Sequence, residues 1–310
     1  MSLNVAGLTA YVDQERMALI KKMILAGRSV RYLTVQPDIK SAASINLLSS
    51  NLDAQAGGCG FTDAGTTILT QNTLNVCPLK VNESICLNTL EQYYTQAMMN
   101  PGSYNTQIPF EQLYAEEKVS QISSLIDNLI WRGNTSTGSG DLALCNGFIA
   151  LADVTYSGSV VDGNVLNYTA ITAANIIGIV DDAVNVIPAN IIDQDDLYLY
   201  CGYDFYRTYA TALRNANLFH YTGAEDQGEQ FSQMVPGTNV RMIAVKGLNT
   251  TNKFFISSKS NLFFGTDLLN DYENFELWYS MDFQEVRMAS KWKQGVNSAF
   301  WEYVVYFKLN

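Results

Sequence analysis

One histidine limits the catalytic chemistry open to this chain. His220 is the only histidine in the sequence, so any acid–base or nucleophilic catalysis that depends on a histidine must use it. It lies between Phe219 and Tyr221, with no serine or cysteine nucleophile motif nearby. We therefore interpret His220 as a partly buried structural residue rather than as a catalytic one.

A second group of residues that could do chemistry is acidic. Asp193, Asp195 and Asp196 follow an apolar segment, and carboxylate oxygens at this spacing could hold a hard divalent cation. The alternative is a solvated turn before a strand, which we favour. A carboxylate pair of the glycosidase type also stays open, because any two of the 30 acidic residues could meet in space. No two acidic residues are singled out as such a pair by their spacing in the sequence.

The cysteines form the third group. They number five and include no Cys-x-x-Cys pair: Cys59, Cys77, Cys86, Cys145 and Cys201. We expect reduced, mostly buried thiols, because the N-terminal residues lack the pattern of a secretory signal. A metal site built from Cys59, Cys77 and Cys86 is the sharper interpretation, but a single histidine leaves it short of ligands.

A glycine-rich stretch and the net charge give two further constraints on function. Residues 133–140 lack the lysine that a phosphate-binding loop needs, and they follow a predicted helix rather than a strand. We therefore predict no catalytic, cofactor-binding or metal-binding residues. The net charge is −11 and no run of lysine or arginine stands out, so we expect no tight binding to nucleic acid. No apolar run approaches the roughly 20 residues that span a bilayer.

The elements that would position these residues begin with an N-terminal arm. A 3.6-residue apolar period predicts a helix over 9–26 that ends at Gly27. Residues 41–52 are mostly small and polar and are expected to lie along a surface. A second helix is predicted over 84–99.

A β-hairpin is predicted between these segments. Two β-prone runs, 66–70 and 73–81, flank Gln71 and Asn72, which we interpret as the turn. The runs carry little apolar surface. A ribbon that buries so little of itself usually rests on something else, such as another subunit.

The strongest helix prediction covers 110–132. Pro109 precedes it, Gly133 ends it, and it would be on the order of 35 Å long at 1.5 Å per residue. Its apolar stripe is Ala115, Val119, Ile122, Ile126 and Leu129. A helix of this length can act as a spine for the fold.

The second half of the chain predicts an inserted αβ lobe followed by returning strands. The lobe contains helices at 170–187 and 204–215 and a buried strand at 197–203. Near the C-terminus, residues 275–283 and 301–309 alternate large apolar with other side chains, which predicts two half-buried strands.

The order of these parts resembles the Hong Kong 97 fold of tailed-phage major capsid proteins. The C-terminal match is the most specific, and it is carried by Val235-Pro236-Gly237, by Lys253-Phe254-Phe255-Ile256, by residues 261–267 and by the charged strand through Arg287. The resemblance covers nearly the whole chain and implies an α+β fold. It implies an N-terminal arm at 1–57, an E-loop at 58–85, a P-domain at 86–146 with its spine helix at 110–132, an A-domain at 147–245, P-domain return strands at 246–296 and a final A-domain strand at 297–310.

The resemblance also implies a function without enzymatic activity or cofactors. The expected protein self-assembles through pentamers and hexamers into the icosahedral head shell around double-stranded phage DNA, in the virion, after assembly in the host cytoplasm. Its implied partners are a portal and scaffolding or decoration proteins, with no membrane. The shell lining is expected to carry no lysine or arginine patch, since packaged DNA must slide.

A finer resemblance concerns the group of phages. Residues 55–61 and 130–133 resemble capsid proteins of phages that infect Bacteroidetes, including the crAss-like group.

Two alternatives stay open. One is an encapsulin-like compartment protein, which shares the fold but encloses enzymes, and the other is a carboxylate-dependent hydrolase.

Overall fold

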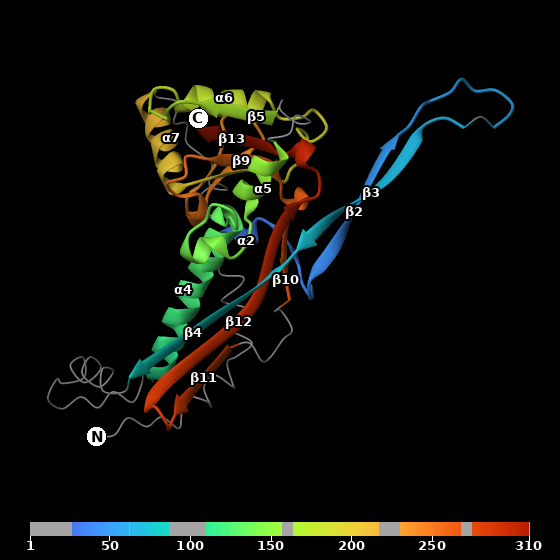
Figure 1. The fold of residues 1–310 in the computed structure, drawn as a ribbon. Coiled ribbons are helices and arrows are strands. Elements are labelled where there is room, and N and C mark those ends of the chain that lie inside the picture. The colour runs from blue at the N-terminus through green and yellow to red at the C-terminus, as the bar shows by residue number, and fades with distance from the viewer. Residues whose placement is uncertain are drawn as a thin grey trace.

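The computed structural model describes residues 27–61, 63–86, 110–156, 164–216, 230–267 and 275–309. Two sheets are joined by one long helix, and a two-stranded arm projects away from them (Figure 1). The helix expected over 9–26, most of the helix expected over 84–99, and His220 all lie outside the described residues.

The long helix α4 spans Phe110–Arg132, as predicted. Its expected stripe is buried, with Val119, Ile122 and Ile126 at most 4% exposed. The backbone N–H of Gly133 donates to the carbonyl oxygen of Leu129 as the helix ends. A side chain at position 133 would overlap the carbonyl oxygen of Cys145, so glycine permits this close approach.

A five-stranded sheet lies along α4. Its strands are β1 (Thr34–Gln36), β10 (Leu262–Thr266), β12 (Glu285–Ser298), β11 (Phe275–Ser280) and β4 (Cys77–Cys86). Strand β12 pairs with β10, β11 and β4. Strand β12 alternates with period two. Its buried residues Val286, Met288 and Trp292 join the same apolar cluster as the stripe of α4.

A six-stranded sheet forms the other end of the body. Its order is β5 (Val165–Tyr168), β13 (Val305–Leu309), β9 (Phe254–Ser258), β6 (Leu197–Cys201), β8 (Arg241–Ala244) and β7 (Ser232–Met234). Helices α6 (Ile176–Asn185) and α7 (Tyr203–Asn215) share one apolar cluster with this sheet. The end of α4 and α5 (Phe148–Thr155) share a second cluster with its opposite face.

Short segments connect these units. They are α2 (Arg28–Arg31) and the 3₁₀ turns η1 (Gly140–Ala143), η4 (Lys246–Leu248), η5 (Lys259–Asn261) and η6 (Trp301–Tyr303). None of the helices within the described residues is long and apolar enough to cross a membrane.

Two expected strands near the C-terminus are shorter than the alternation predicted. The first ends at Ser280, and Met281 and Phe283 are exposed in the turn that leads to β12. In the second, Trp301–Tyr303 form η6, and only Val305–Leu309 form a strand. Val305, Tyr306 and Phe307 are all fully buried. The half-buried expectation is wrong here because helices cover both faces of this sheet.

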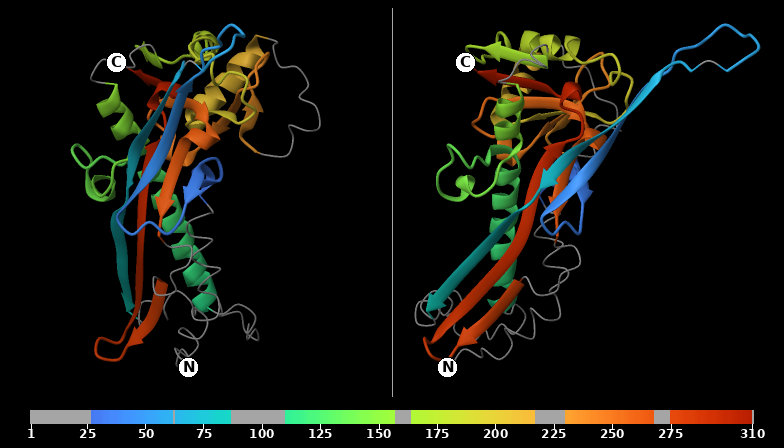
Figure 2. Two further views of the ribbon diagram at one scale, coloured as in Figure 1. Left: turned by 90° about the vertical axis from the view of Figure 1, so that its right-hand side faces the viewer. Right: turned by 45° about the vertical axis from the view of Figure 1, so that its right-hand side comes forward.

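The projecting arm consists of β2 (Ala42–Asn51) and β3 (Thr66–Asn75), which pair antiparallel over ten residues each (Figure 2). The turn expected at Gln71 and Asn72 is wrong, because both residues lie inside β3. The Gln71 side-chain amide is satisfied within the sheet, because it donates to Asn46 Oδ1 on the partner strand (2.9 Å). The connection between the strands is instead the glycine-rich segment 52–65.

Three further expectations change. Residues 41–52, expected along a surface, contain the whole of strand β2. Ser84, Ile85 and Cys86 belong to β4 rather than to a helix. Strand β9, inside the segment 246–296, pairs with β6 and β13 in the six-stranded sheet rather than with β12.

Candidate assembly surface

The arm carries apolar side chains that nothing in the described chain covers. Leu48, Leu52, Phe61, Ile68 and Leu69 are 56 to 96% exposed. Leu48 and Leu69 face each other across the two strands. Exposed apolar side chains on a two-stranded ribbon mark an interaction site, since such a ribbon is at best marginally stable alone. The arm is therefore the strongest candidate for a surface that another molecule covers.

The base of the arm is fixed to the body. Ile45 and Leu74 pack with Ile39 and Ala299 in a small apolar cluster. Close by, the Asn72 side chain donates to the carbonyl oxygen of Ser298 (2.7 Å). Along each arm strand, side chains change from exposed to buried within a few residues. The base of the arm therefore packs against the body, and the distal part does not.

A glycine sets how closely the arm meets the body. A side chain at position 295, in β12, would overlap the carbonyl oxygen of Asn75, the last residue of β3. Glycine is required where two backbones approach this closely. The chain passes from the arm into β4 at this point, with only Val76 between the two strands.

A cavity of about 520 Å³ lies next to the base of the arm. Its lining residues are Lys40, Pro78, Leu79, Lys80, Asp267, Lys291, Trp292 and Lys293. We call it the lysine pocket. Lys293 Nζ contacts Asp267 Oδ2 at 3.2 Å and donates to the carbonyl oxygen of Lys40 (2.7 Å).

Lys80 and Lys291 stand directly opposite each other across the β4–β12 ladder. The alternation of β12 directs Trp292 to the α4 side and therefore Lys291 to the other face of the sheet. Lys80 and Lys291 are exposed. Four lysines from three separate segments thus converge on one cavity in a chain of net charge −11.

One buried carboxylate ties the N-terminal segment to the body. Asp127 of α4 accepts hydrogen bonds from the backbone N–H of Ser29 in α2 (3.0 Å) and of Gly247 in η4 (3.2 Å). The Ser29 hydroxyl in turn accepts from the indole N–H of Trp131 (2.6 Å). Burial raises the pKa of the Asp127 carboxyl, while the hydrogen bonds from Ser29, Gly247 and Lys246 oppose that rise. We call this group the Asp127 knot.

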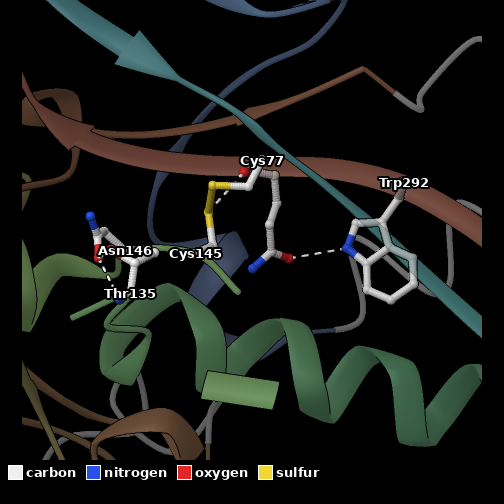
Figure 3. Close-up of a disulfide and its surroundings, with 6 residues drawn as sticks. Cys77, Thr135, Cys145, Asn146 and Trp292 are labelled. Carbon is white, nitrogen blue, oxygen red and sulfur yellow. Dashed lines mark hydrogen bonds between the residues drawn. A yellow bond between two sulfur atoms is a disulfide. The ribbon is translucent and has the colours of Figure 1, made fainter. Parts of the chain in front are cut away.

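A disulfide joins Cys77 to Cys145, so the expectation of five reduced thiols is wrong (Figure 3). The two residues are 68 positions apart in sequence, and their Cα atoms lie 5.9 Å apart. The sequence could not pair them, because the loop after α4 brings Cys145 to the start of β4 only in the fold. Cys59 and Cys86 are exposed free thiols and Cys201 is buried. Burial raises the pKa of the Cys201 thiol.

The other candidate residues from the sequence do not form a site in the described part of the chain. Asp193 and Asp195 are exposed, and Asp196 accepts a hydrogen bond from the backbone N–H of Ser260 (3.1 Å). Within those residues, no group of three or more His, Cys, Asp or Glu side chains could hold a metal ion. The alternative of a metal site built from Cys59, Cys77 and Cys86 is ruled out, since Cys77 belongs to the disulfide.

The lysine pocket was not predicted from the sequence. Lys291 and Lys293 are near neighbours in sequence, but Lys40 and Lys80 come from distant segments. A signal was available in the alternation of β12, which puts Lys291 and Lys293 on one face. Only the register of β4 against β12 adds Lys80 to them.

The sequence matches no protein-family model and no curated protein. The fold, by contrast, is similar to solved phage capsid structures. One is the satellite phage P4 procapsid including the size determination (Sid) protein, at 12% identity and a TM-score of 0.57, covering 96% of this chain and 99% of that one. A second is the capsid of the native GTA particle, at 10% identity and a TM-score of 0.55, covering 93% and 90%. A third is the capsid of cyanophage P-SCSP1u, at 10% identity and a TM-score of 0.53, covering 90% and 86%.

Proposed function

We propose that this chain is a major capsid protein of a tailed phage that self-assembles into the head shell around double-stranded DNA. The observation that carries the proposal is the likeness to capsid structures over almost the entire chain. The exposed apolar arm adds independent support, because it needs a second molecule to cover it. The chain acts by shape and contact rather than by catalysis.

The architecture supports an assignment of parts in terms of the Hong Kong 97 fold. We infer that the arm 42–75 is the E-loop, in place of the range 58–85 that the sequence implied. Helix α4 is then the spine of the P-domain, together with the five-stranded sheet. The six-stranded sheet with α6 and α7 is the A-domain, which takes β9 from the segment 246–296 as well as the final strand β13.

The finer proposals concern assembly and origin. Subunits gather as pentamers and hexamers in the virion, with a portal at one vertex and with scaffolding or decoration proteins supplied by other chains. The segments 55–61 and 130–133 favour a phage of Bacteroidetes, in the crAss-like group. Assembly takes place in the host cytoplasm.

Electron microscopy of the expressed protein tests the proposal. Closed shells or tubes of regular diameter are the expected result. Particles that enclose a co-expressed enzyme and no DNA would instead identify an encapsulin-like compartment. A protein that stays monomeric at high concentration and hydrolyses a substrate, with loss of that activity on changing a single carboxylate, would contradict the proposal.

A further inference from the structure

We propose that the Cys77–Cys145 disulfide is a redox lock. It is open while the subunit folds and assembles, and it closes afterwards, when the shell meets an oxidant outside the host cell. The inference rests on the proposed function, which places assembly in the host cytoplasm. Thiols are kept reduced there, so a structural disulfide is unusual in a protein made in that compartment. A bridge that forms only after assembly removes the conflict.

The fold holds Cys77 in place without the bridge. Cys77 is the first residue of β4, and all ten residues of β4 are paired with β12. Buried side chains of both strands, among them Leu79 and Trp292, belong to the apolar cluster that includes α4. Strand β4 therefore keeps its position when residue 77 carries a free thiol.

Cys145 is held independently of the bridge as well. It lies near the end of the loop that leaves α4, and hydrogen bonds within that loop close it (Figure 3). The backbone N–H of Gly147 donates to the carbonyl oxygen of Gly133 (2.8 Å). The backbone N–H of Thr135 donates to Asn146 Oδ1 (2.8 Å). These bonds span the loop, so Cys145 stays beside the start of β4 in both redox states.

The site also suits a reduced Cys145. This residue is buried, with 2% of its surface exposed, so its thiol would be shielded from water. The carbonyl oxygen of Gln294 lies 3.4 Å from Cys145 Sγ, and a thiol is a weak donor that can use such an acceptor. Two free thiols can therefore face each other in the folded chain until an oxidant arrives.

The two thiols differ in access, which sets the order of the closing reaction. Cys77 is partly exposed, whereas Cys145 is buried. The oxidant is a low-molecular-mass disulfide such as oxidised glutathione. The Cys77 thiolate attacks one sulfur of that disulfide and releases one thiolate, and the Cys145 thiolate then attacks the Cys77 sulfur and releases the second. The protein loses two electrons and two protons, and the oxidant leaves as two thiols.

The place of the bridge decides what the lock holds. Val76 alone separates Cys77 from the end of β3, so the bridge lies where the arm joins the body. Before closure, hydrogen bonds and side-chain packing hold this junction, and the angle of the arm can adjust as subunits meet. Closure links the junction covalently to the loop after α4. The lock therefore fixes the arm after assembly and is not required for it.

Thiol trapping tests the timing in the wild-type protein. Cells that contain assembled shells are dissolved in denaturing buffer with N-ethylmaleimide, which labels every free thiol, and peptide mass spectrometry reads each cysteine. Cys77 and Cys145 should both carry the label. In shells purified under reductant and then incubated with oxidised glutathione, the same two residues should be found as one disulfide-linked peptide pair.

A variant without the bridge tests what the lock does. Cys77→Ser/Cys145→Ala should form shells in the same yield as the wild type. After treatment with oxidised glutathione, amides at the start of β4 should exchange with deuterium about tenfold or more slowly in wild-type shells than in the variant, because the bridge suppresses local opening there. Cys86→Ser, at the other end of β4, is the matched control and should behave as the wild type does.

Three results would overturn the inference. A bridge already complete in the trapped cytoplasmic protein would make it a folding disulfide. Failure of Cys77→Ser/Cys145→Ala to form shells, while its subunit still melts cooperatively, would show that assembly needs the bridge. Equal amide exchange in oxidised wild type and variant would show that the bridge fixes nothing. A wild-type protein that closes its bridge only after release but forms no shells would support the redox behaviour and count against the proposed function.

Discussion

Strand β3 of the arm and strand β13 of the body each pair with an antiparallel neighbour, yet their environments are opposite. Three consecutive residues of β13, from Val305 to Phe307, are fully buried between two layers of helices. In β3 only Leu74, near the base, is buried, and its first six residues are exposed. The apolar side chains of β13 are covered by their own chain, whereas Ile68 and Leu69 of β3 stay exposed in the described structure.

The comparison predicts that the arm can be removed without unfolding the body. Replacing residues 47–70 by Asn-Gly would join Asn46 to Gln71, which are already a cross-strand pair. The truncated protein should form no shells, while its free energy of unfolding should change by less than about 1 kcal/mol, since the lost residues bury little. Electron microscopy and urea unfolding measure the two effects. Normal shells from this variant would contradict the role given to the arm.

The difference can be measured with one type of substitution at two places. Ile126→Ala, in the fully buried stripe of α4, should lower the free energy of unfolding by about 2 to 5 kcal/mol. Ile68→Ala, at a position 56% exposed on the arm, should change it by less than about 0.5 kcal/mol. Urea unfolding of the two variants checks the pair. Equal effects would erase the distinction between arm and body.

The disulfide should strengthen the body at the point where the arm enters it. Cys77→Ser should cost about 2 to 4 kcal/mol of unfolding free energy, because the bridge closes a loop of 68 positions that contains α4. Cys86→Ser removes an exposed free thiol and should have little effect. Melts with and without reductant provide the measurement. A wild-type melt that reductant leaves unchanged would show that the bridge is not formed.

The smallest expected effect is a pH dependence from the Asp127 knot. Burial raises the pKa of this carboxyl in the folded chain above its unfolded value of about 3.9. The folded state therefore holds more protons between these two pKa values, and the contribution of Asp127 to stability falls as pH rises through that window. It is fully present below the unfolded pKa. Urea unfolding across pH should show a shallower decline in Asp127→Asn than in the wild type. Identical slopes would exclude Asp127 as the source.

The part of the fold that the sequence could predict is the part governed by local periodicity. Helix α4 was predictable to the residue, because its apolar stripe, preceding proline and closing glycine agree. Strand β6 and helix α7 were close to their predicted limits for the same reason. Helices α4 and α7 show a 3.6-residue apolar period, and β6 is a short apolar run that is almost fully buried. In each case a single chain segment contains the information.

The arm and the candidate site escaped prediction because their partners are distant or absent. Gln71 and Asn72 are typical of turns, and only pairing with Asn46 and Ile45 shows that they lie within a strand. Cys77 and Cys145 meet through the path of the loop after α4, which no spacing reveals. The lysine pocket depends on the register of β4 against β12. In each case the deciding contact joins segments far apart in the sequence.

The disulfide has a mechanical consequence for the arm. Strand β3 continues through Val76 into Cys77, so tension on the arm arrives at the bridge after a single intervening residue. From there the force passes through covalent bonds to Cys145, two residues before Gly147, whose N–H donates to the carbonyl oxygen of Gly133 (2.8 Å) at the end of α4. Pulling on the arm therefore cannot unzip β4 from β12 starting at Cys77. The arm behaves as a tether whose anchor is the long helix, and a lateral pull from a neighbouring molecule is shared with the whole length of the body.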